Sequence, residues 1–341
     1  MKEAMLYEKL TNNKVKCNLC NHRCIIKDEN YGICGVRQNR GGSLFSIVYD
    51  RIIATHVDPI EKKPLFQFYP GSTAYSIATV GCNLSCKHCQ NFDISQSPRE
   101  NRGHIVGNKM EPKEIVKEAE SAGCTSIAYT YTEPTIFFEL AYDTAKLAQT
   151  KGIKNVFVSN GFMTPEALKE ISPFLDGINI DLKAFTDRFY KEICGGSLEP
   201  VLENIKLANE LGIWLEVTTL IIPTHNDNPE ELSRIAEFIA NTDKDIPWHI
   251  SQFYPTYKLT NLPRTPIEIL HKAREIGLQA GLHYVYEGNV PGMGNENTYC
   301  YNCGNLLIER WGYSILKNII EDGHCPFCKS PIAGVYSRQF N

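Results

Sequence analysis

From residue 73 to residue 280, short apolar stretches alternate with longer amphipathic ones, and this alternation restricts the fold more than any other feature of the sequence. The stretches predicted to be strands are 73–80, 125–131, 154–159, 177–182, 213–219 and 248–252. Those predicted to be helices are 112–122, 134–150, 164–172, 197–211, 229–240 and 266–280. Strand–helix alternation is typical of a parallel sheet. We therefore expect an α/β fold, a partial TIM-like (β/α)6 barrel, with 283–287 as a short further strand.

The length and composition of the chain fit one such barrel with small additions. A barrel needs roughly 200–250 residues, and the 341 residues are 43% hydrophobic and 22% charged. We expect an N-terminal four-cysteine module with extended strands at 1–70, the barrel at 71–290 and a C-terminal zinc-ribbon-like module at 295–341. The net charge of −4 gives no basic surface for nucleic acid. No apolar run suits a membrane span or a signal peptide, so we expect a cytoplasmic protein without membrane or nucleic-acid partners.

The 13 cysteines fall into separate groups along the chain. They are Cys17, Cys20, Cys24 and Cys34; Cys82, Cys86 and Cys89; Cys300, Cys303, Cys325 and Cys328; and two single residues, Cys124 and Cys194. Thiols stay reduced in the cytoplasm, so the groups predict three metal sites rather than disulfides. We interpret the two single cysteines as ordinary small residues of the barrel or its loops.

The central group, Cys-x3-Cys-x2-Cys, directly follows the first predicted strand of the barrel. Three thiolates can hold a 4Fe-4S cluster that takes four ligands and leave one iron open. An open metal position is typical of a catalytic site. The alternative is three ligands of a zinc site whose fourth ligand lies elsewhere in the chain.

The two terminal groups each contain four cysteines and no open position. Cys300-x2-Cys303 and Cys325-x2-Cys328, separated by 21 residues, form a zinc-ribbon pattern, which predicts a structural zinc site. For Cys17, Cys20, Cys24 and Cys34 we favour zinc, with an auxiliary iron–sulfur cluster as the alternative, since thiolates suit both.

Polar motifs follow several of the predicted strands. Thr132-Glu133-Pro134 follows the second, Ser159-Asn160-Gly161 the third, and Asp181 and Lys183 close the fourth. The carboxyl ends of barrel strands lie on one face, where barrel active sites are built. The positions of the motifs therefore predict an enzyme. His225, His249, Tyr254 and Glu287 are weaker candidates for the same mouth of the barrel.

The cysteine loop resembles that of the radical S-adenosylmethionine (SAM) enzymes. The segments 130–135, 158–162 and 180–183 are similar to the branch that contains pyruvate formate-lyase activating enzyme. Asp-Pro-Ile-Glu-Lys-Lys-Pro-Leu (58–65), Trp-His-Ile-Ser-Gln-Phe-Tyr-Pro (248–255) and Gly-Asn-Val-Pro-Gly (288–292) resemble the radical SAM member of the AmmeMemoRadiSam system. The resemblance runs from about residue 15 to residue 336.

This resemblance implies a set of residues that bind the cofactors. Cys82, Cys86 and Cys89 would hold the cluster, and SAM would be bound by His88, Thr132, Glu133, Ser159, Asn160, Asp181 and Lys183. Glu133 would pair with the SAM ammonium, although Tyr131 and Thr132 stand where related enzymes have two glycines. The alternatives are a helix-start carboxylate for Glu133, a loop residue without ligand contacts for His88, and a structural ion pair for Asp181 and Lys183.

The resemblance also implies the reaction. The cluster would reductively cleave SAM to a 5′-deoxyadenosyl radical that abstracts hydrogen from an unidentified substrate, a partner protein being one candidate. The expected electron donor is a flavodoxin or ferredoxin. The alternatives are a glycyl-radical enzyme activase and a non-catalytic zinc scaffold or adaptor.

Overall fold

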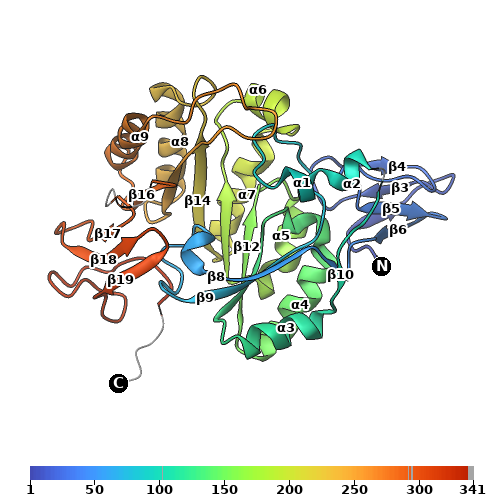
Figure 1. Cartoon of the computed structure of the whole chain (residues 1–341), viewed down its shortest axis with the longest axis horizontal. Helices are drawn as coiled ribbons and strands as arrows, with labels where there is room; N and C mark the ends of the chain where they lie inside the picture. Colours follow the sequence, from blue (N-terminus) through green and yellow to red (C-terminus); the bar gives the residue numbers. More distant parts are fainter. Residues whose placement is uncertain (102, 291, 293–294, 337–341) are drawn as a thin grey trace.

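A central sheet of eight strands organises the computed structural model, which describes residues 1–101, 103–290, 292 and 295–336. The strand order is β16-β15-β14-β13-β12-β11-β9-β8, parallel throughout except that β8 runs antiparallel to β9 (Figure 1). The strands are β8 (Ala54–Pro59), β9 (Thr73–Ala78), β11 (Ser126–Tyr129), β12 (Lys154–Ser159), β13 (Gly177–Asp181), β14 (Trp214–Ile221), β15 (Trp248–Gln252) and β16 (Val285–Gly288). The predicted α/β fold with a partial parallel barrel is confirmed. The short further strand expected at 283–287 is β16.

Six longer helices connect or follow the parallel strands. They are α3 (Pro112–Ser121), α4 (Phe138–Thr150), α5 (Pro165–Ile171), α7 (Glu199–Glu210), α8 (Pro229–Thr242) and α9 (Ile267–Gln279). Right-handed crossovers between sequential neighbours place such helices on the same face of a sheet. Shorter helical turns are η1 (Ile60–Lys62), α1 (Phe92–Ser95), α2 (Ser97–Glu100), η2 (Pro134–Phe137), η3 (Ser172–Phe174), α6 (Asp187–Phe189) and the π-helical η4 (Tyr190–Cys194).

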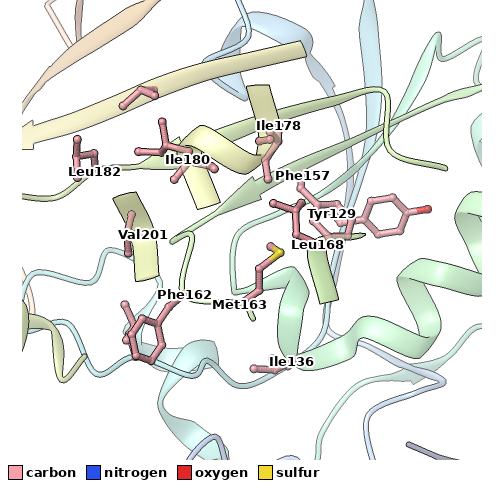
Figure 2. Close-up of a cluster of buried hydrophobic side chains, with 14 of the residues drawn as sticks. Tyr129, Ile136, Phe157, Phe162, Met163, Leu168, Ile178, Ile180, Leu182 and Val201 are labelled. Atoms are coloured by element: carbon pink, nitrogen blue, oxygen red, sulfur yellow. The ribbon is translucent and has the colours of Figure 1, made fainter. Parts of the chain in front are cut away.

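The main hydrophobic core lies between the sheet and these helices. Figure 2 shows Phe157, Ile178 and Ile180 of the sheet beside Leu168 of α5 and Val201 of α7, and all five are buried. Successive residues of a strand face opposite sides, so Asn179 and Asp181 face away from this core.

The segment 60–68 covers part of the other face of the sheet. The backbone N–H groups of Phe66 and Gln67 both donate to the Glu216 carboxylate at 2.9 Å, and Asn179 donates to the Pro64 carbonyl at 2.8 Å. A second hydrophobic cluster forms beneath it: Ile60, Leu65, Phe68, Ala74, Ala128 and Val156. The segment therefore packs against this face of the sheet at Asn179 of β13 and Glu216 of β14.

The two cysteine-rich ends of the chain lie on opposite sides of the central sheet (Figure 1). The N-terminal strands are β1 (Lys2–Glu3), β2 (Tyr7–Lys9), β3 (Val15–Cys17), β4 (Ile25–Ile26), β5 (Arg37–Arg40), β6 (Ser43–Ser46) and β7 (Arg51–Ile52), which pairs with β10 (Asn108–Lys109). The C-terminal strands are β17 (Thr298–Tyr299), β18 (Leu306–Trp311) and β19 (Ser314–Asn318). Pro291, within the 288–292 motif, lies outside the described residues. Within the described part of the chain, no helix has the length and apolar character needed to cross a membrane.

Candidate active site

The cysteine loop begins where β9 ends and is held by contacts from several elements. Gly81 has φ +109°, and a Cβ atom there would lie 2.7 Å from Val36 Cγ1, so the close approach requires glycine. Arg99 of α2 donates through Nη2 to the carbonyl oxygen of Cys82 at 3.2 Å. These contacts fix the backbone that carries the three cysteines.

The thiols of Cys82 and Cys89 have polar neighbours that suit the ligands of a cluster. The Leu84 N–H donates to Cys82 Sγ at 3.4 Å, and Cys89 Sγ lies 3.2 Å from Ser95 Oγ. Hydrogen bonds to ligating sulfur orient it and tune a cluster. A zinc ion with bonds of about 2.3 Å would bring its thiolates to about 3.8 Å from one another. The Sγ atoms of these three described cysteines do not all lie within 4.8 Å of one another, which fits thiolates that bind three different irons.

Glu133 joins the ends of β11 and β12 beside the loop. Its carboxylate accepts from Thr135 N at 3.1 Å and Thr135 Oγ1 at 2.6 Å, from Ser159 Oγ at 2.8 Å and from Asn160 N at 2.8 Å. Glu133 is only 2% exposed. Burial raises the pKa of Glu133, and the hydrogen bonds from Asn160, Thr135 and Ser159 oppose that shift. Three of these four bonds end on Oε1, so among the described residues Oε2 has only the Asn160 partner.

Asn160 connects this network to the cysteine loop. Its Nδ2 donates to Asn83 Oδ1 at 2.7 Å and lies 3.7 Å from Cys82 Sγ. Thr132 instead donates its hydroxyl to the Thr79 carbonyl at 2.8 Å, at the end of β9. The structure thus brings Glu133, Ser159 and Asn160 together beside Cys82, with Thr132 supporting the neighbouring backbone.

Tyr131 has a backbone conformation that usually requires glycine. It has φ +62°, in the left-handed region that favours glycine. Its hydroxyl donates to Asp58 Oδ2, and the Lys63 ammonium lies 4.5 Å from the centre of its ring. Lys63 Nζ also donates to Asp58 Oδ2 at 2.6 Å. The tyrosine keeps the glycine-like backbone because this buried cluster holds its side chain.

A second polar group lies on the other side of the loop, around Cys86. Lys183 donates to Asp181 Oδ2 at 2.8 Å, and its charge lies close to Cys86 and His88. His88 is buried, and burial followed by the charges of Lys183 and His225 lowers its pKa to about 3. Its Nδ1 has no partner among the described protein atoms. The structure therefore places Asp181 and Lys183 close to Cys86 and His88 of the cysteine loop, and their predicted binding of SAM stays a prediction.

Cys194 was not predicted to belong to this site. Its Sγ, Cys86 Sγ and a ring nitrogen of His88 all lie within 4.8 Å of one another. The hydrogen bond from Cys194 lowers the pKa of Cys86, while burial raises the pKa of Cys194. The sequence signal was the following pair, Gly195-Gly196, because a Cβ on Gly195 would lie 2.4 Å from Ser85 Oγ. Two adjacent glycines marked the close approach of this segment to the loop.

Of the weaker candidates, His249 lies away from the site. Its Nε2 lies 2.6 Å from Glu216 Oε2, near the amino ends of β14 and β15, and its ring contacts Phe66 at a centroid distance of 4.7 Å. Glu287 is buried and bonded to His271, at 2.9 Å. Tyr254 is exposed. His225, in contrast, packs its ring 6.3 Å from that of Phe189 and faces His88.

The two four-cysteine groups differ in geometry. In the C-terminal group Cys300 Sγ lies 3.6 Å from Cys328 Sγ, and Cys303 Sγ lies 3.7 Å from Cys325 Sγ. All four sulfurs lie within 4.8 Å of one another. This is the spacing that a tetrahedral zinc ion requires. The N-terminal cysteines instead line a small cavity next to Arg37 and Ile136.

Comparisons with known proteins agree with this site. The family model of the radical SAM superfamily matches residues 76–239, which include the cysteine loop, Glu133 and Asp181. An uncharacterized protein of Methanocaldococcus jannaschii is 48% identical over 335 residues, covering 97% of this chain and 99% of that protein. The pyruvate formate-lyase-activating enzyme of Clostridium pasteurianum is 24% identical over 169 residues, 47% of this chain and 67% of that enzyme.

A solved structure with a similar fold is that of Streptococcus suis SuiB bound to S-adenosylmethionine. It has a TM-score of 0.49 and 13% identity, and the match covers 67% of this chain and 53% of SuiB. The family model and the cysteine loop on a partial parallel barrel lead to one conclusion. This chain belongs to the radical SAM superfamily.

Proposed function

We propose that this protein is a radical SAM oxidoreductase that abstracts hydrogen from a substrate not yet identified. The observation that carries the proposal is the placement of Cys82, Cys86 and Cys89 in a loop that follows the carboxyl end of β9, with Asn160 hydrogen-bonded both to Asn83 of this loop and to Glu133. When bound, a 4Fe-4S cluster supplies the electron that cleaves SAM to methionine and a 5′-deoxyadenosyl radical, which takes hydrogen from the substrate.

The chain's own residues position and shield these groups. Glu133 Oε2 and the amide of Asn160 present an anionic acceptor and polar groups for the amino acid part of SAM. Asp181 and Lys183 form an ion pair beside Cys86 on the other side of the loop. Buried apolar residues such as Leu84 and Val80 exclude water from the loop.

Half-buried residues at the carboxyl ends of the strands suit a place of entry for the substrate. On the face opposite the helices, Val158, Asp181, Leu220, Ser251 and Gly288 each lie near the carboxyl end of a different strand and are only half-buried. Together they mark the carboxyl-terminal edge of this face of the sheet. We infer that the substrate, or a loop of a partner protein, enters there. A flavodoxin or ferredoxin is the class of electron donor that fits.

A glycyl-radical activase is the second function, favoured by the similarity to the pyruvate formate-lyase-activating enzyme. The more specific resemblance, to the AmmeMemoRadiSam member, instead favours a substrate other than a glycyl-radical enzyme. The two functions can be distinguished by incubating the protein with SAM and a candidate partner in deuterated solvent. The molecule into which deuterium is incorporated identifies the substrate.

The test of the proposal is SAM cleavage by the reduced, reconstituted protein. We expect 5′-deoxyadenosine from the wild type and none from Cys82→Ala, Cys86→Ala or Cys89→Ala. Cys124→Ala is the matched control, because Cys124 is a buried thiol outside the site. A colourless protein that binds three zinc ions and cleaves no SAM would instead support the zinc scaffold.

A further inference from the structure

The four N-terminal cysteines share one enclosed cavity but do not converge on a point. Cys17, Cys20, Cys24 and Cys34 all line it, together with apolar side chains such as Ile26. Yet among these four described cysteines no three sulfur atoms lie within 4.8 Å of one another. The C-terminal group in the same structure does meet that limit, and the cysteines of the SAM site do not. The sulfur atoms of the N-terminal group are therefore more widely spaced than those of the C-terminal group, and wider spacing favours a cluster over a single zinc ion.

Arg37 gives an independent sign of a bound group. Its guanidinium is 2% exposed and lines the cavity. Nη1 and Nη2 donate to Glu139 at 2.8 and 2.6 Å, but Nε has no partner among the described protein atoms. A buried donor without an acceptor costs free energy of folding, so Arg37 Nε would be stabilised by an acceptor bound in this cavity. The sulfide and thiolate sulfurs of an iron–sulfur cluster are acceptors with negative charge.

The cavity also adjoins the loop of the SAM site. A Cβ on Gly81 would lie 3.5 Å from the carbonyl oxygen of Cys34, and His22, which lines the cavity, lies 2.7 Å from the carbonyl oxygen of Asn83. Arg99 bonds both segments, through Nε to the Ile33 carbonyl at 3.0 Å and through Nη2 to the Cys82 carbonyl at 3.2 Å. The two cysteine groups thus belong to one rigid neighbourhood.

We propose that Cys17, Cys20, Cys24 and Cys34 bind a second 4Fe-4S cluster, with Arg37 Nε donating to one of its sulfurs. This assignment replaces zinc, which the spacing favoured. With four protein ligands the cluster offers no open iron to SAM. Its chemistry is the uptake of one electron from a flavodoxin- or ferredoxin-class donor and its release to the neighbouring cluster. The proposal goes beyond the proposed function, because the cluster would be present whether or not SAM is cleaved.

The test is the metal content and EPR spectrum of the full chain, reconstituted and reduced without oxygen. We expect about eight irons and one zinc per chain, with one EPR signal that responds to SAM and one that does not. The double variant Cys20→Ser/Cys24→Ser should fall to about four irons and keep the signal that responds to SAM. Cys124→Ser, which removes a buried thiol elsewhere, should keep all eight.

Two results would overturn the assignment. One is a wild-type protein with two zincs and about four irons, and the other is a double variant that loses no iron. If the double variant does not fold, the triple variant Cys82→Ala/Cys86→Ala/Cys89→Ala, which removes the cysteines of the SAM site, tests for the second cluster instead. This triple variant should keep about four irons and the signal that does not respond to SAM, whereas an iron-free triple variant excludes the second cluster. Failure of SAM cleavage with both signals present would instead contradict the proposed function alone.

Discussion

Glu133 Oε2 accepts the backbone N–H of Asn160 at 2.8 Å, which ties the end of β11 to the end of β12 beside Cys82. The same carboxylate holds Ser159 Oγ at 2.8 Å. Glu133 therefore fixes the positions of Ser159 and Asn160 and also places a buried carboxylate beside them. Glu133 also caps the start of η2, since Thr135 N donates to the same carboxylate. The two roles make different predictions.

Glu133→Gln should weaken SAM binding about ten- to a hundredfold, because it removes one charge-assisted hydrogen bond of roughly 1.5–3 kcal/mol. The cleavage rate at saturating SAM should fall less, since this contact already exists in the ground state. SAM affinity can be measured from its effect on the EPR signal of the reduced cluster. Thr135→Val is the matched control, because it removes a bond to the same carboxylate and keeps its charge. Unchanged affinity in Glu133→Gln would show that the residue only starts the helix.

Cys194→Ala should keep the cluster that responds to SAM, whereas Cys86→Ala should lose it. Cys194 lies beside Cys86, but it is not part of the loop that carries the other two ligands. Iron content and the SAM-dependent EPR change are the measurements. Loss of that signal in Cys194→Ala, with a normal melting temperature, would mean that Cys194 is itself a ligand.

Cys303→Ser should lower the melting temperature and leave SAM cleavage by the folded protein intact. The C-terminal sulfurs have zinc spacing, and a structural zinc contributes on the order of 10 kcal/mol to folding of its module. Zinc content should fall from about one ion per chain to none. A variant that instead loses iron at unchanged stability would contradict a structural zinc site.

Asp58→Asn should destabilise the protein by about 3–5 kcal/mol at pH 7, because it leaves the buried Lys63 ammonium without its partner. Burial opposes the ionisation of Asp58, but hydrogen bonds from Lys63, Tyr131 and Lys62 outweigh it and lower its pKa. A carboxyl with a lowered folded pKa stabilises the fold above its unfolded pKa, and this stability is lost as the pH falls. The difference between wild type and variant should therefore shrink below about pH 4.

Urea unfolding at several pH values measures this difference. The control is Asp187→Asn, whose carboxylate pairs with Lys191 at the surface, and it should cost less than about 1 kcal/mol at pH 7. A cost for Asp58→Asn that does not change between pH 7 and pH 3 would contradict the assigned ionisation of this residue.

The sequence by itself determined the features that depend on local order. Alternation of apolar stretches predicted the parallel sheet and its helices, because strand and helix periods are set by neighbouring residues. The spacing of Cys82, Cys86 and Cys89 predicted the cofactor loop, and the motifs around Glu133, Asn160 and Asp181 were placed at strand ends. The cysteine loop and these motifs all lie along the edge that the carboxyl ends of the parallel strands form.

Only the tertiary structure decided which distant residues meet. It showed that Cys194 lies beside Cys86 and that Asp58 bonds both Lys63 and Tyr131. It also showed that His249, expected at the mouth of the barrel, lies near the amino ends of the strands. It also separated the N-terminal sulfurs and left Arg37 Nε without a partner, which spacing along the chain does not reveal. Such contacts arise from the packing of whole elements against one another, and the distance between two side chains in space is independent of their separation in sequence.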